Sequence, residues 1–181
     1  MTRPNISFDV QHLSQFMHAP KKSHYDAALH VVRYIKKQPG LGLLMSSRTS
    51  GKITTFCDAD WAFCLLSRKS VTGFGIKFDD SLVSWKSKKQ STMSKSSAEA
   101  EYRSMATTVA ELVWLQGLLQ ELGATVELPM DIERIFEGLI RTEYVASKEQ
   151  MADIFTKALG KQLHNDMLFK LGLVDIFKDP T

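Results

Sequence analysis

The sequence predicts an α/β domain, and two patterns carry this prediction. Residues 41–89 contain short apolar runs rich in β-branched and aromatic residues, separated by turn clusters, as is typical of consecutive strands. From Ser96 onwards, apolar residues recur at intervals of three and four as far as Leu122, which indicates a long amphipathic helix. With 181 residues, of which 44% are hydrophobic, the chain is long enough for one domain with a sizeable core.

Two helices are predicted ahead of the strands, within residues 7–38. The first covers SFDVQHLSQFMH, and the second covers HYDAALHVVRYIKKQ, with Ser23 as its N-cap and apolar residues along one face. The pair Pro39 and Gly40 ends the second helix, because proline cannot continue the hydrogen-bonded ladder.

Strands are predicted at 41–47, at 52–60 and on both sides of a turn at 79–81. The last three of these strands are expected to pair antiparallel in sequence order. Gly123 closes the long helix, as a C-terminal glycine commonly does. Beyond it, VELPMDI and GLIRTEYV are further strand candidates, and MADIFTKAL and KQLHNDMLFKLG are expected to be helical.

The composition and the pattern of the first residues predict an intracellular protein. No segment approaches the ~18 unbroken apolar residues of a membrane span, and the first residues lack the pattern of a signal peptide. We therefore expect a cytoplasmic or nuclear location and no membrane partner. Cys57 and Cys64 fit neither a zinc spacing nor a disulfide framework, so both are expected to be reduced packing residues.

The long helix carries two glutamates near its start that differ in their expected roles. Glu99 follows Ser96 by three residues and precedes Arg103 by four, which predicts a capping box and a surface ion pair. Glu101 lies along the side of the helix that continues through apolar residues, so it is expected to face the sheet. The alternative is that the side chain of Glu101 reaches solvent at the rim of the helix.

Three carboxylates from distant segments form a candidate site. They are Asp58 at the end of a predicted strand, Glu101 on the first turns of the helix, and Asp153 at the start of the last helical segment. Grouped acids repel one another unless cations neutralise them, and oxygen ligands without His or Cys favour Mg²⁺. Asp60, two residues after Asp58, is more simply explained as a turn-initiating acid.

Basic residues gather in the segment WKSKKQSTMSK and in the loop before the predicted strand that starts at residue 71. They are Lys86, Lys88, Lys89, Lys95 and Arg68. A run of this kind is either a solvated face or a contact for a phosphate backbone. The three tryptophans, Trp61, Trp85 and Trp114, are expected in the core, with base stacking as the second option for Trp61.

Several long sequence segments resemble the ribonuclease H region of copia-type LTR retrotransposon polyproteins. They are CDADW, SRKSVTGFGI, VSWKSKKQSTMSKSSAEAEY, ELVWLQGLLQELG and YVASKEQMADIFTKAL. The front of the chain, TRPNISFDVQHLSQFMHAPKKSHYDAALHVVRYIKKQPGLGLL, is similar to the end of the preceding reverse transcriptase domain. The resemblance implies a helical reverse transcriptase remnant at 1–46 and a ribonuclease H-like domain at 47–181.

This family resemblance implies a mixed five-stranded sheet with helices on its faces. It also implies hydrolysis of the RNA strand of an RNA–DNA hybrid, with two Mg²⁺ ions as cofactors and contacts to 2′-hydroxyl groups that identify RNA. Because they match positions in the family's sequence motifs, Asp58, Glu101 and Asp153 are the expected catalytic residues and metal ligands.

The chain departs from the family pattern after the long helix. The fourth strand is expected to stop near Ile132, short of the family's next aspartate ligand, and the helices that should follow are missing. Asp131 precedes the position of that ligand, and Asn5 stands where the family often has Asp, a difference expected to be neutral. We therefore expect an impaired or inactive nuclease; the alternative is a relic that at most binds nucleic acid.

Overall fold

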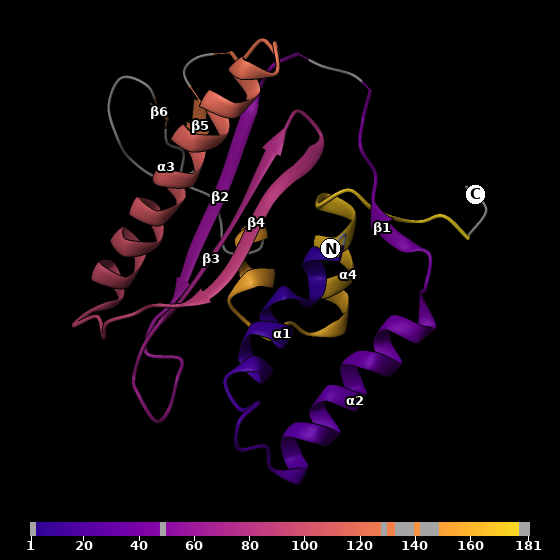
Figure 1. Ribbon diagram of the computed structural model, residues 1–181, viewed down its shortest axis with the longest axis vertical. Coiled ribbons are helices and arrows are strands. Elements are labelled where there is room, and N and C mark those ends of the chain that lie inside the picture. Colours follow the sequence, from indigo (N-terminus) through magenta and orange to yellow (C-terminus); the bar gives the residue numbers. More distant parts are fainter. Residues whose placement is uncertain (1–2, 48–49, 128–129, 133–139, 142–148, 178–181) are drawn as a thin grey trace.

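A five-stranded mixed sheet forms the centre of the molecule (Figure 1). The computed structural model describes residues 3–47, 50–127, 149–177 and, for the backbone alone, 130–132 and 140–141. The strand order is β4-β3-β2-β5-β6. The strands are β2 (Ile53–Asp60), β3 (Val71–Phe78), β4 (Ser81–Lys89), β5 (Met130–Ile132) and β6 (Ile140–Arg141).

Strand pairing confirms the predicted antiparallel meander β2-β3-β4. β5 pairs parallel to β2, and β6 pairs parallel to β5, which makes the sheet mixed. β5 ends at Ile132, whose register partner is Thr55. The remainder of the predicted strand GLIRTEYV lies outside the described residues.

Helix α3 (Ser97–Glu121) covers one face of the sheet. Ser96 is its N-cap, as predicted, and its hydroxyl accepts from the backbone N–H of Glu99 at 3.2 Å. Gly123 has a φ of +76°, the left-handed conformation that favours glycine at a helix end. One buried cluster joins this helix to the sheet. It comprises Ile53, Cys57, Phe74, Ile76, Met105, Leu112 and Leu115.

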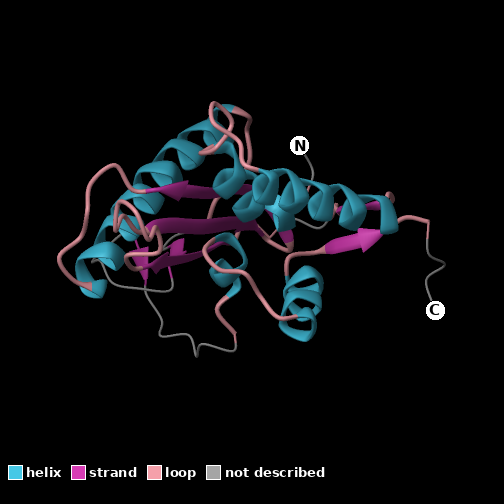
Figure 2. Ribbon diagram, turned by 90° about the horizontal axis from the view of Figure 1, so that it is seen from below, coloured by secondary structure: helices cyan, strands magenta, loops and turns pink. Residues whose placement is uncertain are grey.

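The opposite face is covered by short elements from both ends of the chain, so helices lie on both sides of the strands (Figure 2). They are η1 (Pro4–Ile6), α1 (Ser7–Ser14), η2 (Met151–Phe155) and α4 (Lys161–Lys170). The predicted helix at 151–159 is only a 3₁₀ turn, because Thr156 turns into the sheet, where its hydroxyl donates to Asp58.

A second, two-stranded sheet ties the front of the chain to its end. β1 (Leu41–Leu43) pairs antiparallel with β7 (Leu173–Asp175) and not with the main sheet. Leu41 and Leu173 then join the same buried cluster as Phe155. Residues from the predicted segments 1–46 and 47–181 therefore share one core.

Helix α2 (Lys22–Lys37) contacts α1 and has no buried residue. The predicted Ser23 cap is wrong, since the N-cap is Lys21, two residues earlier. The ring nitrogen Nδ1 of His24 accepts from the backbone N–H of Lys21 at 3.1 Å. This contact satisfies a backbone donor at the helix start without a serine.

The tryptophans are less buried than predicted. Trp61 is 44% exposed and Trp114 is 60% exposed, so both lie at the surface, whereas Trp85 packs against the core. The indole N–H of Trp61 donates to the backbone oxygen of the buried Ser94 at 3.1 Å. Among the described residues, no helix has the length and apolar character required to cross a bilayer.

Candidate functional site

The carboxylate of Asp58 projects from β2 toward η2. Asp58 is 8% exposed, and its Oδ2 accepts from the hydroxyl of Thr156 at 2.5 Å. Its register partner on β3 is Gly73. A Cβ at Gly73 would lie 2.5 Å from Thr156 Cγ2 and 2.7 Å from Phe155 Cβ, so this glycine is what permits η2 to approach the strand.

Asp153 joins Asp58 from η2, and a lysine links the two. Asp153 is also 8% exposed. The ammonium of Lys157 lies 2.9 Å from Asp153 Oδ1 and 3.3 Å from Asp58 Oδ2. Two of the three predicted carboxylates thus meet in one half-enclosed ion-pair cluster, and its cation comes from the chain itself.

Burial and neighbouring charges shift the pKa values of Asp153 and Lys157. Burial raises the pKa of Asp153, and the nearby charge of Asp58 raises it further against the hydrogen bond from Lys157. Burial alone would lower the pKa of Lys157, but the bond to Asp153 and the charge of Asp58 together raise it. The ammonium is therefore held in its charged form.

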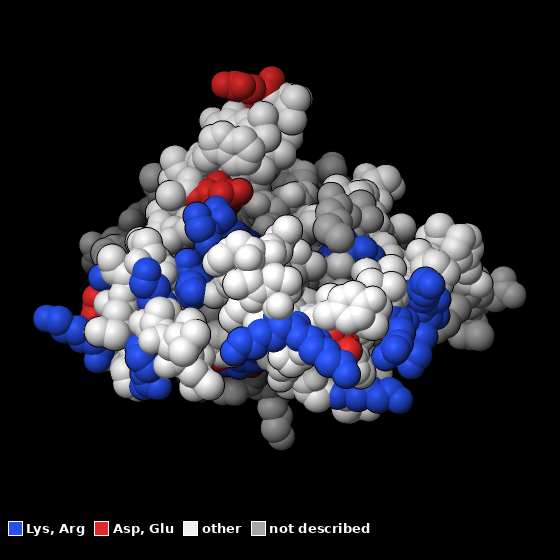
Figure 3. Space-filling model, turned by 60° about the horizontal axis from the view of Figure 1, so that its bottom comes forward, with Lys and Arg blue, Asp and Glu red and all other residues white. Residues whose placement is uncertain are grey.

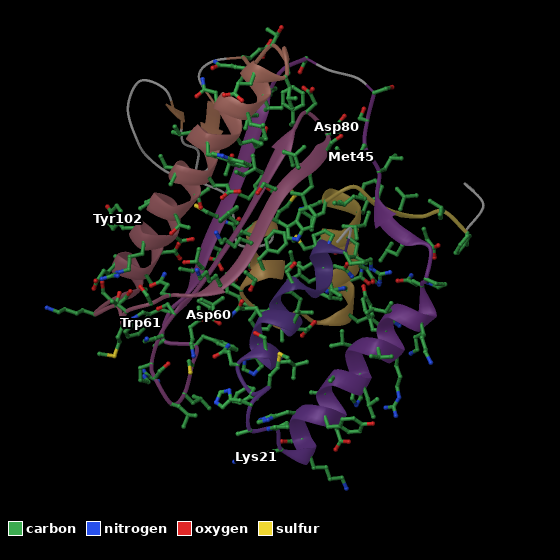
Figure 4. The ribbon with its side chains drawn as sticks, viewed as in Figure 1. Lys21, Met45, Asp60, Trp61, Asp80 and Tyr102 are labelled. Atoms are coloured by element: carbon green, nitrogen blue, oxygen red, sulfur yellow. The ribbon has the colours of Figure 1, made fainter. Side chains whose placement is uncertain are left out.

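Asp60 ends β2 beside this cluster. Figure 4 places Asp60 and Trp61 at the end of the strand, near the first turns of α3 where Tyr102 lies. Burial raises the pKa of Asp60, the charge of Lys157 lowers it and that of Asp58 raises it. Asp60 therefore ends the strand, and its carboxylate also interacts electrostatically with Lys157 and Asp58.

Glu101 belongs to the helix on the opposite face. The hydroxyl of Ser104, one turn further along α3, donates to the backbone oxygen of Asp58 at 2.8 Å, so this part of the helix lies directly over β2. The predicted Glu99–Arg103 ion pair is confirmed at 2.8 Å. Within the described part of the chain, however, no three His, Cys, Asp or Glu side chains are placed to hold a metal ion.

Backbone register sets the position of Asp131. Asp131 pairs with Thr54, and Ile132 pairs with Thr55. Asp58 lies four residues beyond Thr54, or ~13 Å along a strand at ~3.3 Å per residue. Asp131 therefore does not take the place of the family's ligand beside Asp58.

The described side chains do not fit the two Mg²⁺ ions that the family implies. Asp58 and Asp153 are the two carboxylates that converge, and the ammonium of Lys157 already contacts both of them. A Mg²⁺ ion prefers about six oxygen ligands and would have to displace that ammonium. Sequence reasoning missed Thr156 and Lys157, although both stand in the segment QMADIFTK, three and four residues after Asp153.

The predicted basic residues divide between the two faces of the sheet. Lys86 lies on the α3 face, with its ammonium 5.8 Å from the ring centroid of Phe74. Lys89 donates to Gln15 at 2.6 Å on the face of α1. Arg68 is exposed in the loop before β3, and Lys95 is exposed just ahead of α3.

A basic groove runs between the edge strand β4 and the start of α3. Its volume is ≈ 330 Å³, and its lining includes Lys86, Lys88, Lys89, Gln90, Arg103 and Thr107. Arg103 was not predicted as part of it, because its spacing from Glu99 explained it as an ion-pair partner. Figure 3 shows this end of the molecule, where Lys and Arg side chains predominate over Asp and Glu.

Replacing Asp153 by asparagine is expected to leave the fold at pH 7 as stable as the wild type, or more stable. The pKa of Asp153 is raised above its ordinary value of 3.8 in the folded state, so folding favours the protonated carboxyl. The stabilising contribution of Asp153 is therefore complete below pH 3.8 and is lost as pH rises through the folded pKa. Asparagine avoids this loss and can still accept from Lys157. Urea denaturation between pH 3 and 7 checks this; a variant less stable by more than about 1 kcal/mol at pH 7 would contradict it.

Comparison with known proteins identifies the family. The chain is 30% identical over 206 residues to the retrovirus-related Pol polyprotein from transposon RE2 of Arabidopsis thaliana, covering 97% of this chain and 14% of that protein. It is 36% identical over 122 residues to the corresponding polyprotein from transposon TNT 1-94 of Nicotiana tabacum, covering 67% of this chain and 9% of that protein. The chain belongs to the copia-type retrotransposon Pol polyprotein family.

This copia-type chain corresponds to a small part of its relatives, about one seventh of the RE2 polyprotein. An uncharacterized mitochondrial protein of Arabidopsis thaliana is 41% identical over 114 residues, 63% of this chain and 48% of that protein. The RE2 alignment spans 206 positions, more than the 181 residues of this chain. At least 25 positions of it therefore lack a counterpart here, in agreement with a shortened copia-type sequence.

No protein-family model matches the chain. No solved structure matches it either.

Proposed function

We propose that this chain is a ribonuclease H-like, nucleic-acid-binding domain of retrotransposon origin in which Mg²⁺-dependent hydrolysis of hybrid RNA is lost or severely reduced. The observation that carries this proposal is the Lys157 ammonium between Asp58 and Asp153, 3.3 and 2.9 Å from their oxygens. Two-metal hydrolysis needs a carboxylate cage open to both ions. Here an internal cation neutralises the two acids that converge.

The basic groove supports the binding half of the proposal. Lys86, Lys88 and Arg103 line it together, and a groove lined by cations attracts a phosphate backbone through release of its counterions. Gln90 is held in place by bonds from its amide to Thr72 Oγ1 and the backbone oxygen of Ala100. A fixed amide beside lysines suits contacts to sugar and phosphate.

An RNA–DNA hybrid is the partner that the copia-type family suggests. Thr107 and Ser91 add hydroxyl groups to the lining of the groove, and hydroxyls are suited to contacts with the 2′-OH of an RNA strand. We therefore expect the hybrid to bind more tightly than duplex DNA of the same sequence.

A cleavage assay tests the catalytic half. A labelled RNA–DNA hybrid incubated with excess protein and Mg²⁺ is expected to stay intact. Mg²⁺-dependent cleavage by the wild type that disappears in Asp58→Asn would favour the second candidate, a working ribonuclease H, and overturn the proposed loss.

Binding assays at several salt concentrations test the other half. Lys86→Ala combined with Lys88→Ala is expected to weaken hybrid binding by about tenfold and to reduce the salt slope by about two. Lys22→Ala combined with Lys36→Ala, on the exposed side of α2, is the matched control. An affinity that neither salt nor the groove variant changes would exclude the groove as a backbone contact.

A further inference from the structure

The outer face of α3 carries apolar side chains that no described element covers. The inner face of this helix packs against β2 and β3, whereas Val113, Trp114 and Leu118 are 56%, 60% and 36% exposed. Ala110 and Gly117 are exposed beside them, and no atom lies within 4 Å of a Cβ placed on Gly117. A contiguous apolar surface of this kind is typical of a site where another molecule binds.

Part of this face repeats at the spacing of a coiled-coil contact. Six residues follow one another along it at alternating intervals of four and three positions. They are Arg103, Thr107, Ala110, Trp114, Gly117 and Glu121, and together they form the α3 seam. Such a 3.5-residue repeat keeps one stripe of a helix in contact with a second helix over several turns.

The α3 seam is complementary to itself when a second copy of the helix runs antiparallel, with the two-fold axis level with Leu112. Ala110 and Trp114 lie two residues before and two residues after Leu112, so each indole would lie over the small Ala110 of the other copy. Thr107 and Gly117 lie five residues from Leu112 on either side and would form the next layer. A larger side chain then meets a smaller one in each of these layers, which allows close helix packing.

Charges favour the same antiparallel arrangement. Arg103 and Glu121 each lie nine residues from Leu112, so the guanidinium of one copy would meet a carboxylate of the other. The Arg103 side chain is 41% exposed although it pairs with Glu99, and Glu121 is exposed. Residues 113–127 contain two glutamates and neither lysine nor arginine. The second half of the helix therefore suits the cationic first half of another copy.

We infer that two copies of this chain associate through the α3 seam as an antiparallel, two-fold symmetric dimer. A parallel pair would place Trp114 against Trp114 and Glu121 against Glu121, so that size and charge both oppose it. One helix from each copy forms an interface smaller than the ~1,600 Å² of standard stable complexes. The dimer is therefore expected to be weak, with a Kd of about 10 µM.

Sedimentation equilibrium of the full chain without nucleic acid tests this inference. The 20.4 kDa chain is expected to be monomeric at about 0.1 µM and mostly dimeric at about 100 µM. Nucleic acid is left out because Arg103 and Thr107 also line the basic groove, where a bound hybrid would compete with the second copy. A chain that stays monomeric at the higher concentration would overturn the inference. Hybrid binding, measured at the lower concentration, would be unaffected.

Substitutions in the apolar layers locate the interface. Trp114→Ser is expected to weaken the dimer about tenfold, because a tryptophan at the centre of an interface carries much of the binding energy. Leu66→Ser is the matched control, since it removes a leucine that is 91% exposed in the loop between β2 and β3, outside the α3 seam. An equal effect of both substitutions would overturn the inference.

A charge exchange tests the antiparallel direction. Glu121→Arg is expected to weaken the dimer about tenfold, because the new cation would face Arg103 of the second copy. Adding Arg103→Glu is expected to restore the wild-type Kd, and circular dichroism checks that each variant is folded. A folded double variant that associates no more tightly than Glu121→Arg alone would overturn the proposed pairing.

Discussion

Replacing Gly73 by alanine is expected to lower the free energy of unfolding by about 3 kcal/mol, the upper end of the usual cost of overpacking. The added Cβ would lie 2.5 Å from Thr156 Cγ2 and 3.1 Å from the backbone carbon of Phe155. Neither side can yield easily, because Phe155 is fully buried and β3 is paired on both edges. Urea denaturation followed by circular dichroism measures this change.

Gly117 provides the matched control for this substitution. It lies inside α3, and no atom comes within 4 Å of a Cβ placed there, so Gly117→Ala is expected to stabilise the fold by about 0.5–1 kcal/mol. A Gly73→Ala variant as stable as the wild type would show that η2 does not pack against β3 as described. It would also remove the basis for the contact between Thr156 and Asp58.

Replacing Lys157 by methionine is expected to cost about 2 kcal/mol at pH 7. Removal of one partner from a fully buried ion pair costs about 3–5 kcal/mol, and we reduce that figure because the Lys157 side chain is 40% exposed and therefore screened by water. The loss arises because Asp58 and Asp153 are left facing each other without a cation. Urea denaturation at low ionic strength checks this value.

The pH dependence of the Lys157→Met variant follows from the same charges. The pKa of Lys157 is raised above 10.5, so the lysine's contribution is present throughout neutral pH and is lost only as pH rises through that folded value. Toward acidic pH the variant is expected to approach the wild type in stability, because protonated carboxyls no longer repel. A difference that is constant from pH 3 to 8 would contradict an electrostatic origin.

Mg²⁺ separates two interpretations of the same cluster. If Lys157 is the resident cation, millimolar Mg²⁺ is expected to raise the unfolding temperature of Lys157→Met but not that of the wild type, since binding to the folded state alone stabilises it. Lys161→Met, an exposed lysine at the start of α4, is the control. A wild-type protein stabilised by Mg²⁺ as strongly as the variant would argue against Lys157 as a substitute for the metal.

The local sequence was sufficient for most of the secondary structure near the site. Strand patterns at 52–60 and 71–89 and the three-four repeat after Ser96 predicted β2, β3, β4 and α3, because alternation and helical periodicity are properties of neighbouring residues. The same reasoning separated Glu99 from Glu101, since the Ser96 cap and the pair with Arg103 need only local spacing. The return bond of the predicted capping box is displaced by one residue, because the Glu99 carboxylate accepts from the backbone N–H of Lys95 and not of Ser96.

Contacts between distant segments could not be predicted in this way. The glycines in TGFGI are explained only once Phe155 is seen packed against Gly73 and Gly75 from residues about 80 positions away. The pairing of β1 with β7, and the surface positions of Trp61 and Trp114, likewise depend on which segments fold together.

By itself, the sequence determined the α/β class, the family and the candidate carboxylates Asp58, Glu101 and Asp153. Only the tertiary structure decided that Asp58 and Asp153 meet across Lys157 while Glu101 belongs to the helix on the opposite face, and that Asp131 lies four residues short of Asp58. The physical reason is that residue type and periodicity specify which groups are available. Distance, burial and the identity of the neutralising cation arise only when separate segments pack together.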